Sequence, residues 1–328
     1  MAAADQIKTL IKSFGESDET RFFSTAMQIA ATEARQGHTT FAQELKALID
    51  KAKKERSTFT IDNKAISLSL PKRELHELIE VFVPRIKFND LVLDEKVKLP
   101  LSRLIEEQQR WQELKNYNLE PTRKLLLVGP PGTGKTMTAQ AIAGELDIAV
   151  YIIRLDGLMS KYLGESISKL RLIFDTMQSH RAVYFFDEFD SIGSHRNQGH
   201  DIGEIKRVLN SFLINIEKDS SNSIIIAATN LPESLDVALF RRFDEIIKYP
   251  LPDKTQIKEV IQKCTQPYSF SKSPDYGELA ILALGMNYSD ITKACNELVK
   301  SMVLSHANKL DTGLLEDVLK KRKSTNGK

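Results

Sequence analysis

The sequence predicts an α/β fold, namely a five-stranded parallel sheet flanked by helices, with a small all-helical lid after it and a helical segment before it. Between residues 85 and 250, short apolar runs alternate with helical stretches; these runs are KLLLV, AVYII, AVYFF, SIIIAA and EIIKY. Runs that are apolar throughout and rich in Val and Ile are typical of parallel strands covered on both faces. Beyond Pro252, only helical periodicity remains.

A chain of 328 residues exceeds one ordinary hydrophobic core and allows two or three domains. We expect an N-terminal helical domain over 1–56, a linker over 57–84, a large α/β domain over 85–250 and a helical lid domain over 251–328. The linker is inferred from STFTIDNKAISLSLPKREL, which is polar and has no helical period.

The first segment is expected to form a small helical bundle. Its stretch ETRFFSTAMQIAATEARQG has a helical apolar stripe and ends at Gly37. Thr40 and Gln43 then resemble a capping box at the start of another helix. The apolar stripe of that helix consists of Phe41, Leu45, Leu48 and Ile49. These residues predict a fold but indicate no chemistry.

Composition and charge exclude several classes of protein. A net charge of +2 provides no overall field that would attract nucleic acid or an acidic membrane. The two cysteines, Cys264 and Cys295, have no metal-like spacing and suit a reducing compartment. No stretch approaches the roughly 20 apolar residues of a membrane span, and the N-terminus lacks a signal-peptide core. We therefore expect a cytoplasmic protein.

The motif GPPGTGKT follows an apolar run and precedes a helical stretch, and it matches the G-x-x-x-x-G-K-[ST] phosphate-binding pattern in that context. Glycines let backbone N–H groups turn toward phosphates, and the helix presents its partial positive end. Lys135 would contact the β- and γ-phosphates, and the Thr136 hydroxyl would ligate Mg²⁺. The residues predicted to bind ATP are Gly129, Pro130, Pro131, Gly132, Thr133, Gly134, Lys135, Thr136 and Met137.

Polar side chains end two further apolar runs. In VYFFDEFD, Asp187 is placed to hold Mg²⁺, and Glu188 is placed to act as a general base toward the attacking water. Asn230, in AATN, could hold that water or sense the γ-phosphate. Adjacent carboxylates can also be plain surface charge, and an Asn at a strand end is usually a turn residue.

These motifs together resemble the AAA family of ATPases, a branch of the AAA+ P-loop superfamily, over about residues 85–310. GPPGTGKT and FFDEFD are similar to the two Walker motifs, SKYLGES to the first pore loop, and AATN with LDVALFRRFDE to the second region of homology. The clustered arginines are similar to those of katanin, spastin and bacterial single-module members. The resemblance implies a sheet order of 5-1-4-3-2, hexameric rings, and ATP held between neighbouring subunits.

The resemblance also implies roles for residues outside the phosphate loop. Asn230 would be the sensor that positions water. Arg241 and Arg242 would be arginine fingers that reach the γ-phosphate of the adjacent subunit, which explains two permanent cations side by side. The alternative for these arginines is pairing within the chain. The candidate partners would be Asp236, Asp244 and Glu245.

The implied pore-loop residues, which would grip an extended polypeptide, are Lys161, Tyr162 and Leu163. Adjacent exposed apolar residues in a loop favour contact with a partner, although burial under the loop is the alternative. The chain departs from the family near the adenine pocket: Tyr288 and Ser289 occupy the place of a common Gly-Ala pair, and 90–93 reads Asp-Leu-Val-Leu where Gly-Gly often follows Asp-Ile.

The resemblance therefore implies an ATP-hydrolysing homo-oligomeric ring that remodels, unfolds or threads a protein or peptide through a central pore. Two alternatives stay open. One is a nucleic-acid motor or loader, against which the near-neutral charge and the Tyr-Leu loop argue. The other is an ATP-dependent scaffold or switch that recruits an effector. No protease nucleophile or H-E-x-x-H zinc motif is recognisable, so proteolysis would require a separately encoded protease or adaptor.

Overall fold

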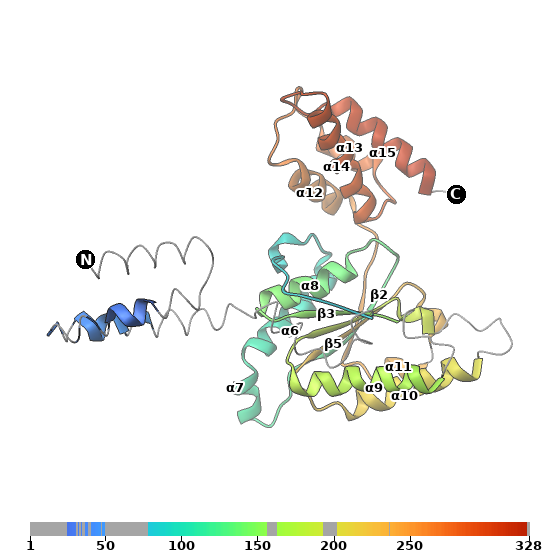
Figure 1. Ribbon diagram of the computed structural model, residues 1–328. Coiled ribbons are helices and arrows are strands. Elements are labelled where there is room, and N and C mark those ends of the chain that lie inside the picture. The colour runs from blue at the N-terminus through green and yellow to red at the C-terminus, as the bar shows by residue number, and fades with distance from the viewer. Residues whose placement is uncertain are drawn as a thin grey trace. The chain divides into compact units, whose positions relative to one another are not determined.

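The chain divides into two compact units, Met1–Ala65 and Ile66–Lys328, shown in Figure 1. The computed structural model describes residues 25–30, 32, 34, 37–38, 41–46, 48–49, 78–155, 163–192, 202–235 and 237–326. In the first unit, residues 25–30 and 41–46 are helical. Its small core is formed by Ala26, Ala30 and Ile49.

The apolar stripe expected in that unit is only partly buried. Ile49 is buried, whereas the side chains of Phe41 and Leu48 are 53% and 63% exposed. The expected capping residue Thr40 lies outside the described residues. Helical periodicity thus identified the helix, but it did not identify which side of the stripe is covered.

The second unit is built around a six-stranded sheet of order β1-β3-β4-β5-β2-β6. The strands are β1 (Ile79–Phe82), β2 (Lys124–Val128), β3 (Val150–Arg154), β4 (Val183–Asp187), β5 (Ile224–Thr229) and β6 (Glu245–Lys248). All pairs except β1–β3 are parallel. Read from β6, the parallel strands follow the order 5-1-4-3-2 that the family resemblance implied.

The expectation of five strands was incomplete, because β1 pairs antiparallel with β3 at the edge of the sheet. It begins within the segment expected to be a linker, and its register joins Ile79 to Ile153 and Phe82 to Val150. An edge strand of four residues has no long apolar run, so its sequence resembles an irregular segment.

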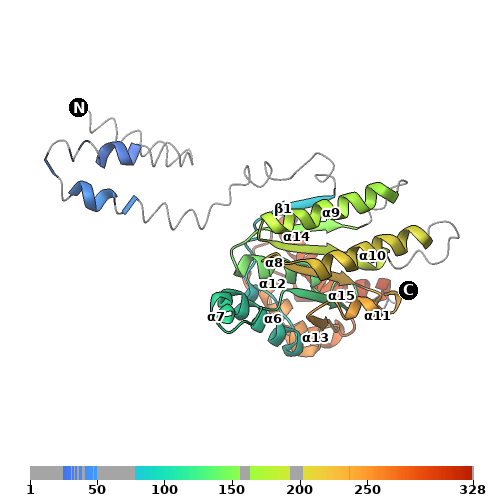
Figure 2. The same cartoon turned by 90° about the horizontal axis from the view of Figure 1, so that it is seen from below.

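Alternating side chains of the strands contribute to two separate cores. One face of the sheet packs on α9 and α10, and the other packs on α6 and α8 (Figures 1 and 2). On β2, Leu126 belongs to the first core, while Leu125 and Leu127 belong to the second. All three are fully buried, as expected for a central strand covered by helices on both faces. The layers hold the carboxyl ends of the parallel strands at one edge.

The helices of the α/β part are α6 (Glu95–Gln109), α7 (Trp111–Asn116), α8 (Lys135–Glu145), α9 (Leu163–Ser179), α10 (Ile202–Lys218) and α11 (Val237–Phe240), with short 3₁₀ turns η1 (Phe88–Asp90), η3 (Phe189–Ile192) and η4 (Pro232–Ser234). No helix among the described residues combines the length and apolar character that a membrane span needs.

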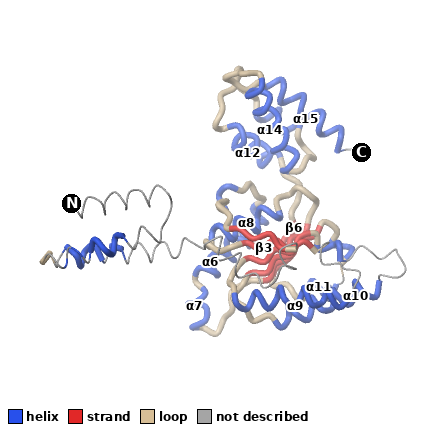
Figure 3. The backbone as a smooth tube through the Cα atoms, viewed as in Figure 1, coloured by secondary structure: helices blue, strands red, loops and turns tan. Residues whose placement is uncertain are grey.

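The C-terminal part is helical, as Figure 3 shows. Its helices are α12 (Lys254–Thr265), α13 (Tyr276–Leu282), α14 (Tyr288–Leu304) and α15 (Thr312–Asn326). They share a separate apolar core that includes Ile257, Leu298 and Leu319. Helix α12 starts with a capping box in which the Asp253 carboxylate accepts from the Gln256 N–H, and the Gln256 side chain accepts from the Asp253 N–H. This box fixes the start of the helical lid.

Candidate nucleotide site

A phosphate-binding loop connects the carboxyl end of β2 to the first turn of α8. Gly132 and Gly134 have φ values of +74° and +99°, which glycine adopts without a steric penalty. At Gly129, a Cβ atom would lie 2.4 Å from the carbonyl oxygen of Tyr249. Gly129 therefore approaches the backbone of Tyr249 too closely to carry a side chain. The N–H groups of the loop and the N-terminus of α8 form a cradle suited to phosphate.

Lys135 is only 7% exposed, and its ammonium lies inside this cradle. It donates to the carbonyl oxygens of Gly129 and Pro130, at 2.7 and 2.9 Å, and to Asn230 Oδ1 at 2.9 Å. Burial lowers the pKa of Lys135 to about 8, while two nearby carboxylates oppose this shift. All three acceptors are neutral, so the cation would be attracted strongly to a polyphosphate.

Thr136 and Asp187 bring two oxygen ligands together from different elements. The Thr136 Oγ1 hydroxyl, on the first turn of α8, donates to Asp187 Oδ2, at the end of β4, over 3.3 Å. Mg²⁺ prefers such hard oxygen ligands and usually keeps several waters beside one or two protein ligands. The pair therefore fits a phosphate-bound Mg²⁺, and Thr136 and Asp187 would hold it.

Glu188 has an unusual backbone conformation beside this pair. Its φ is +50°, a left-handed value that costs a non-glycine residue roughly 1–3 kcal/mol. Its N–H donates to Asp187 Oδ1 at 2.9 Å, and its side chain is exposed. This hydrogen bond between neighbouring residues offsets part of the strain. An exposed carboxylate at this edge, with no hydrogen-bond partner among the described residues, suits a general base.

Asp190 is a site residue that the sequence analysis missed. Its Oδ1 accepts from the Asn230 N–H at 3.1 Å and from Thr229 Oγ1 at 3.2 Å. Lys135 donates to the side-chain oxygen of Asn230 at the same time, so Asn230 is held at its backbone N–H by Asp190 and at its side chain by Lys135. The signal was present in FFDEFD, whose last carboxylate follows the Walker pair at a spacing of one 3₁₀ turn.

These residues line a cavity of about 420 Å³, within the usual size range of ligand sites. Its walls come from the phosphate loop, the ends of β4 and β5, and helix α14. The predicted residues brought together there are Pro131, Gly132, Gly134, Lys135, Thr136, Met137, Asp187, Glu188 and Asn230. Helix α14 adds Tyr288, Ser289, Thr292 and Lys293, of which the sequence analysis singled out the first two.

Helix α14 contacts the phosphate loop directly. The Ser289 N–H donates to the Gly132 carbonyl oxygen at 3.1 Å, and a Cβ atom on Gly132 would lie 2.7 Å from Asn287 Cγ. The Tyr288 hydroxyl donates to Gln256 Oε1 at 3.1 Å, and burial raises the pKa of Tyr288. The residues that replace the common Gly-Ala pair thus belong to the wall of this cavity.

The two adjacent arginines do not line the cavity of their own chain. Arg242 pairs with Glu217, with 3.1 Å between Nη2 and Oε2. Arg241 is exposed, and no residue in the described part of the chain pairs with it. Asp244, a suspected partner, accepts instead from the N–H groups at the start of β2. Asp236, another suspected partner, lies outside the described residues.

The predicted pore-loop residues cannot be placed on this framework. Lys161 and Tyr162 lie outside the described residues, and Leu163 is the first residue of α9. Their proposed role therefore stays a prediction from sequence.

The sheet order, the glycine cradle and the Mg²⁺-compatible pair define a P-loop nucleotide-binding protein with a helical lid. The ATPase family associated with various cellular activities (AAA) matches residues 125–251. An uncharacterized AAA family ATPase, y4kL of Sinorhizobium fredii, is 30% identical over 93% of this chain and 90% of its own length. The chain therefore belongs to the AAA family of ATPases, and this membership supports ATP hydrolysis.

Longer relatives match the chain over part of their length. A cell division cycle protein 48 homolog of Archaeoglobus fulgidus is 34% identical over 72% of this chain and 32% of its own length. The meiotic spindle formation protein mei-1 of Caenorhabditis elegans is 35% identical over 62% of this chain and 43% of its own length. The chain thus spans less than half the length of these two relatives.

Proposed function

We propose that this ATPase works as a ring, the hexamer that the family resemblance implies, and that it uses hydrolysis to remodel or thread a protein or peptide. The observation that carries the proposal is the division of the site. The phosphate loop, Thr136 and Asp187, Glu188 and Asn230 all line the cavity, whereas Arg241 is exposed and does not line it. A surface guanidinium with no ion-pair partner among the described residues suits delivery to a neighbouring subunit.

In the proposed reaction, water attacks the γ-phosphorus of ATP, its proton passes to the Glu188 carboxylate, and the bond to the β-phosphate oxygen breaks. Lys135 neutralises charge on the β- and γ-phosphates, and Asn230 orients the water. A bound Mg²⁺ supplies charge neutralisation of the phosphates. Arg241 of the next subunit would stabilise the charge that develops in the transition state.

Replacement of Glu188 by Gln tests the general base. The variant keeps the shape and hydrogen-bonding size of the side chain but cannot accept the proton, so we expect retained ATP binding and loss of turnover of about 10²–10⁴-fold. Glu233→Gln, an exposed carboxylate on η4, is the matched control and should turn over at the parent rate. Hydrolysis by the Glu188 variant at the parent rate would contradict the assignment.

The substrate part of the proposal is tested at the predicted pore loop. Tyr162→Ala should abolish processing of an unstructured protein such as casein while basal hydrolysis continues, because the aromatic ring would transmit motion to the polypeptide. Tyr117→Ala is the control, since this tyrosine is 79% exposed and does not line the nucleotide cavity. Unchanged processing in the Tyr162 variant would favour the scaffold alternative.

A further inference from the structure

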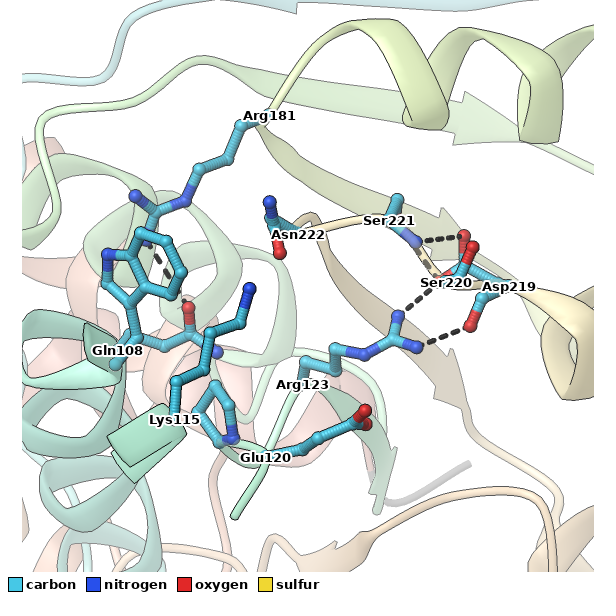
Figure 4. A pocket seen from close by; sticks show the side chains of 11 residues that line it. Gln108, Lys115, Glu120, Arg123, Arg181, Asp219, Ser220, Ser221 and Asn222 are labelled. Carbon is cyan, nitrogen blue, oxygen red and sulfur yellow. Dashed lines mark hydrogen bonds and ion pairs between the residues drawn. The ribbon is translucent and has the colours of Figure 1, made fainter. Parts of the chain in front are cut away.

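A second cavity, of about 220 Å³, opens where the amino ends of β2, β4 and β5 are connected to their preceding segments (Figure 4). The nucleotide cavity lies at the carboxyl ends of the same strands. Helices α6 and α7 and the loops before the three strands supply its walls. The two cavities share no lining residue, so this one needs an explanation of its own.

Its floor is a buried ion pair between Arg123 and Asp219. The Asp219 side chain is fully buried and that of Arg123 is 12% exposed. Arg123 also donates to the Asp219 carbonyl oxygen, and Figure 4 shows both contacts. Asp219 Oδ1 accepts in addition from Gln178 Nε2 at 3.2 Å and from the Ser221 N–H at 3.3 Å. These charges compensate each other, which makes the floor a fixed and neutral surface.

Arg181 provides a charge that is not compensated in this way. Its Nη2 reaches Gln108 Oε1 over a long 3.4 Å, and no carboxylate pairs with it within the described residues. Gln108 is 4% exposed, and its Nε2 donates to the Thr122 carbonyl oxygen at 2.9 Å, which fixes its Oε1 toward the arginine. Figure 4 shows Arg181 extended toward Gln108. Arg181 is exposed by its overall surface area, and partial desolvation of its guanidinium lowers the pKa of Arg181.

An aromatic surface and a second cation complete the wall. The Lys115 ammonium lies 4.6 Å from the centre of the Trp111 ring. Glu120 is the other carboxylate that lines the cavity. With the Arg123–Asp219 pair neutral, Lys115 and Arg181 face one carboxylate, so the cavity has an excess of positive charge.

We propose that this cavity binds one carboxylate side chain, an Asp or Glu, presented by a segment of a partner protein. The volume is below the roughly 300 Å³ at which cavities for whole small molecules begin, and it suits a single side chain. The Arg181 guanidinium offers the planar pair of donors that matches a carboxylate. The ring of Trp111 would cover the methylene groups of the incoming side chain.

Trp111 is the only tryptophan of the chain, so intrinsic fluorescence reports on this cavity directly. The full chain would be titrated with acetyl-Gly-Gly-Glu-Gly-Gly-amide and with the same peptide containing Gln. We expect a saturable change with the Glu peptide and none with the Gln peptide. The affinity for the Glu peptide should fall as salt is added, because the attraction is between charges.

Arg181→Gln should lower the affinity for the Glu peptide by about tenfold or more, since a hydrogen bond between charged groups is lost. Arg171→Gln is the matched control, because this exposed arginine of α9 lines neither cavity. Thermal unfolding of both variants shows that they remain folded. Equal weakening in both variants, or no saturable change with the Glu peptide, would overturn the proposal.

Free glutarate and inorganic phosphate distinguish other sources of the anion. If glutarate and phosphate both bind more weakly than the Glu peptide, the result supports a carboxylate side chain presented by a protein segment. Glutarate that binds as tightly as the peptide would overturn the protein source, and phosphate that binds more tightly would overturn the carboxylate assignment. Binding is measured without nucleotide, so its result does not depend on the proposed ring.

Discussion

The two adjacent arginines should differ sharply when each is replaced by Ala. Arg242→Ala removes an ion pair of 3.1 Å with Glu217, in which the two side chains are 40% and 56% exposed. Exposed pairs contribute only about 0.2–1 kcal/mol of stability. Arg241 forms no ion pair within the described part of the chain, so Arg241→Ala should change the free energy of unfolding by less than about 0.5 kcal/mol. Its effect on turnover should be far larger.

An arginine supplied in trans accelerates phosphoryl transfer by about 10³–10⁵-fold, or roughly 4–7 kcal/mol of barrier. We therefore expect Arg241→Ala to nearly abolish hydrolysis at unchanged stability. Arg242→Ala should lower stability slightly and lower turnover less. Chemical denaturation gives the first quantity, and steady-state phosphate release at saturating ATP gives the second. The reverse order of the two variants in turnover would refute the assignment.

Mixed rings test whether the arginine acts between subunits. An Arg241→Ala subunit retains Glu188, and a Glu188→Gln subunit retains Arg241, so a junction of the two in one order contains both groups. At equal amounts and random assembly, about one quarter of the junctions should be intact. Turnover should therefore exceed that of either variant alone. Absence of any rescue across mixing ratios would exclude action in trans.

Two further predictions concern packing and ionisation. Gly144→Ala should destabilise the chain by about 1–3 kcal/mol, because its Cβ would lie 2.0 Å from the Ile86 carbonyl oxygen, whereas Gly313→Ala meets only a 3.5 Å contact and should not; thermal unfolding decides. The hydrogen bond with Cys295 lowers the pKa of Cys264 to about 7, so alkylation of Cys264 followed by mass spectrometry should accelerate through that pH. In Cys295→Ala the acceleration should shift toward pH 9, and an unshifted profile would contradict the hydrogen bond.

The parallel strands and their order could be predicted because each is a continuous apolar run, and because the motifs at their ends resemble one family. Strand β1 could not, since Ile79–Phe82 is short and gains its pairing from β3, about 70 residues away. Likewise, the stripe containing Phe41 predicted a helix, but exposure depends on what the helix meets, and the sequence pattern does not specify that.

Local motifs identified most of the nucleotide cavity, because the loop 129–136 and the pair Asp187–Glu188 are contiguous in sequence. The contact of Ser289 with Gly132 joins segments more than 150 residues apart, so no local pattern indicates it. The role of Asp190 depends on a hydrogen bond across the ends of two strands, which also has no linear signature. The catalytic roles of these residues stay predictions.

Strand β2 connects the segment that carries the two arginines to the phosphate-binding loop. At its start, the N–H groups of Arg123 and Lys124 bind the Asp244 carboxylate, two residues beyond Arg242, at 3.0 and 2.9 Å. At its other end, Val128 leads into the phosphate loop. Five extended residues make a stiff connection of about 17 Å. A displacement of either end would therefore be transmitted along the backbone to the other. In the proposed ring, this strand would couple the nucleotide site of a subunit to the arginines that face its neighbour.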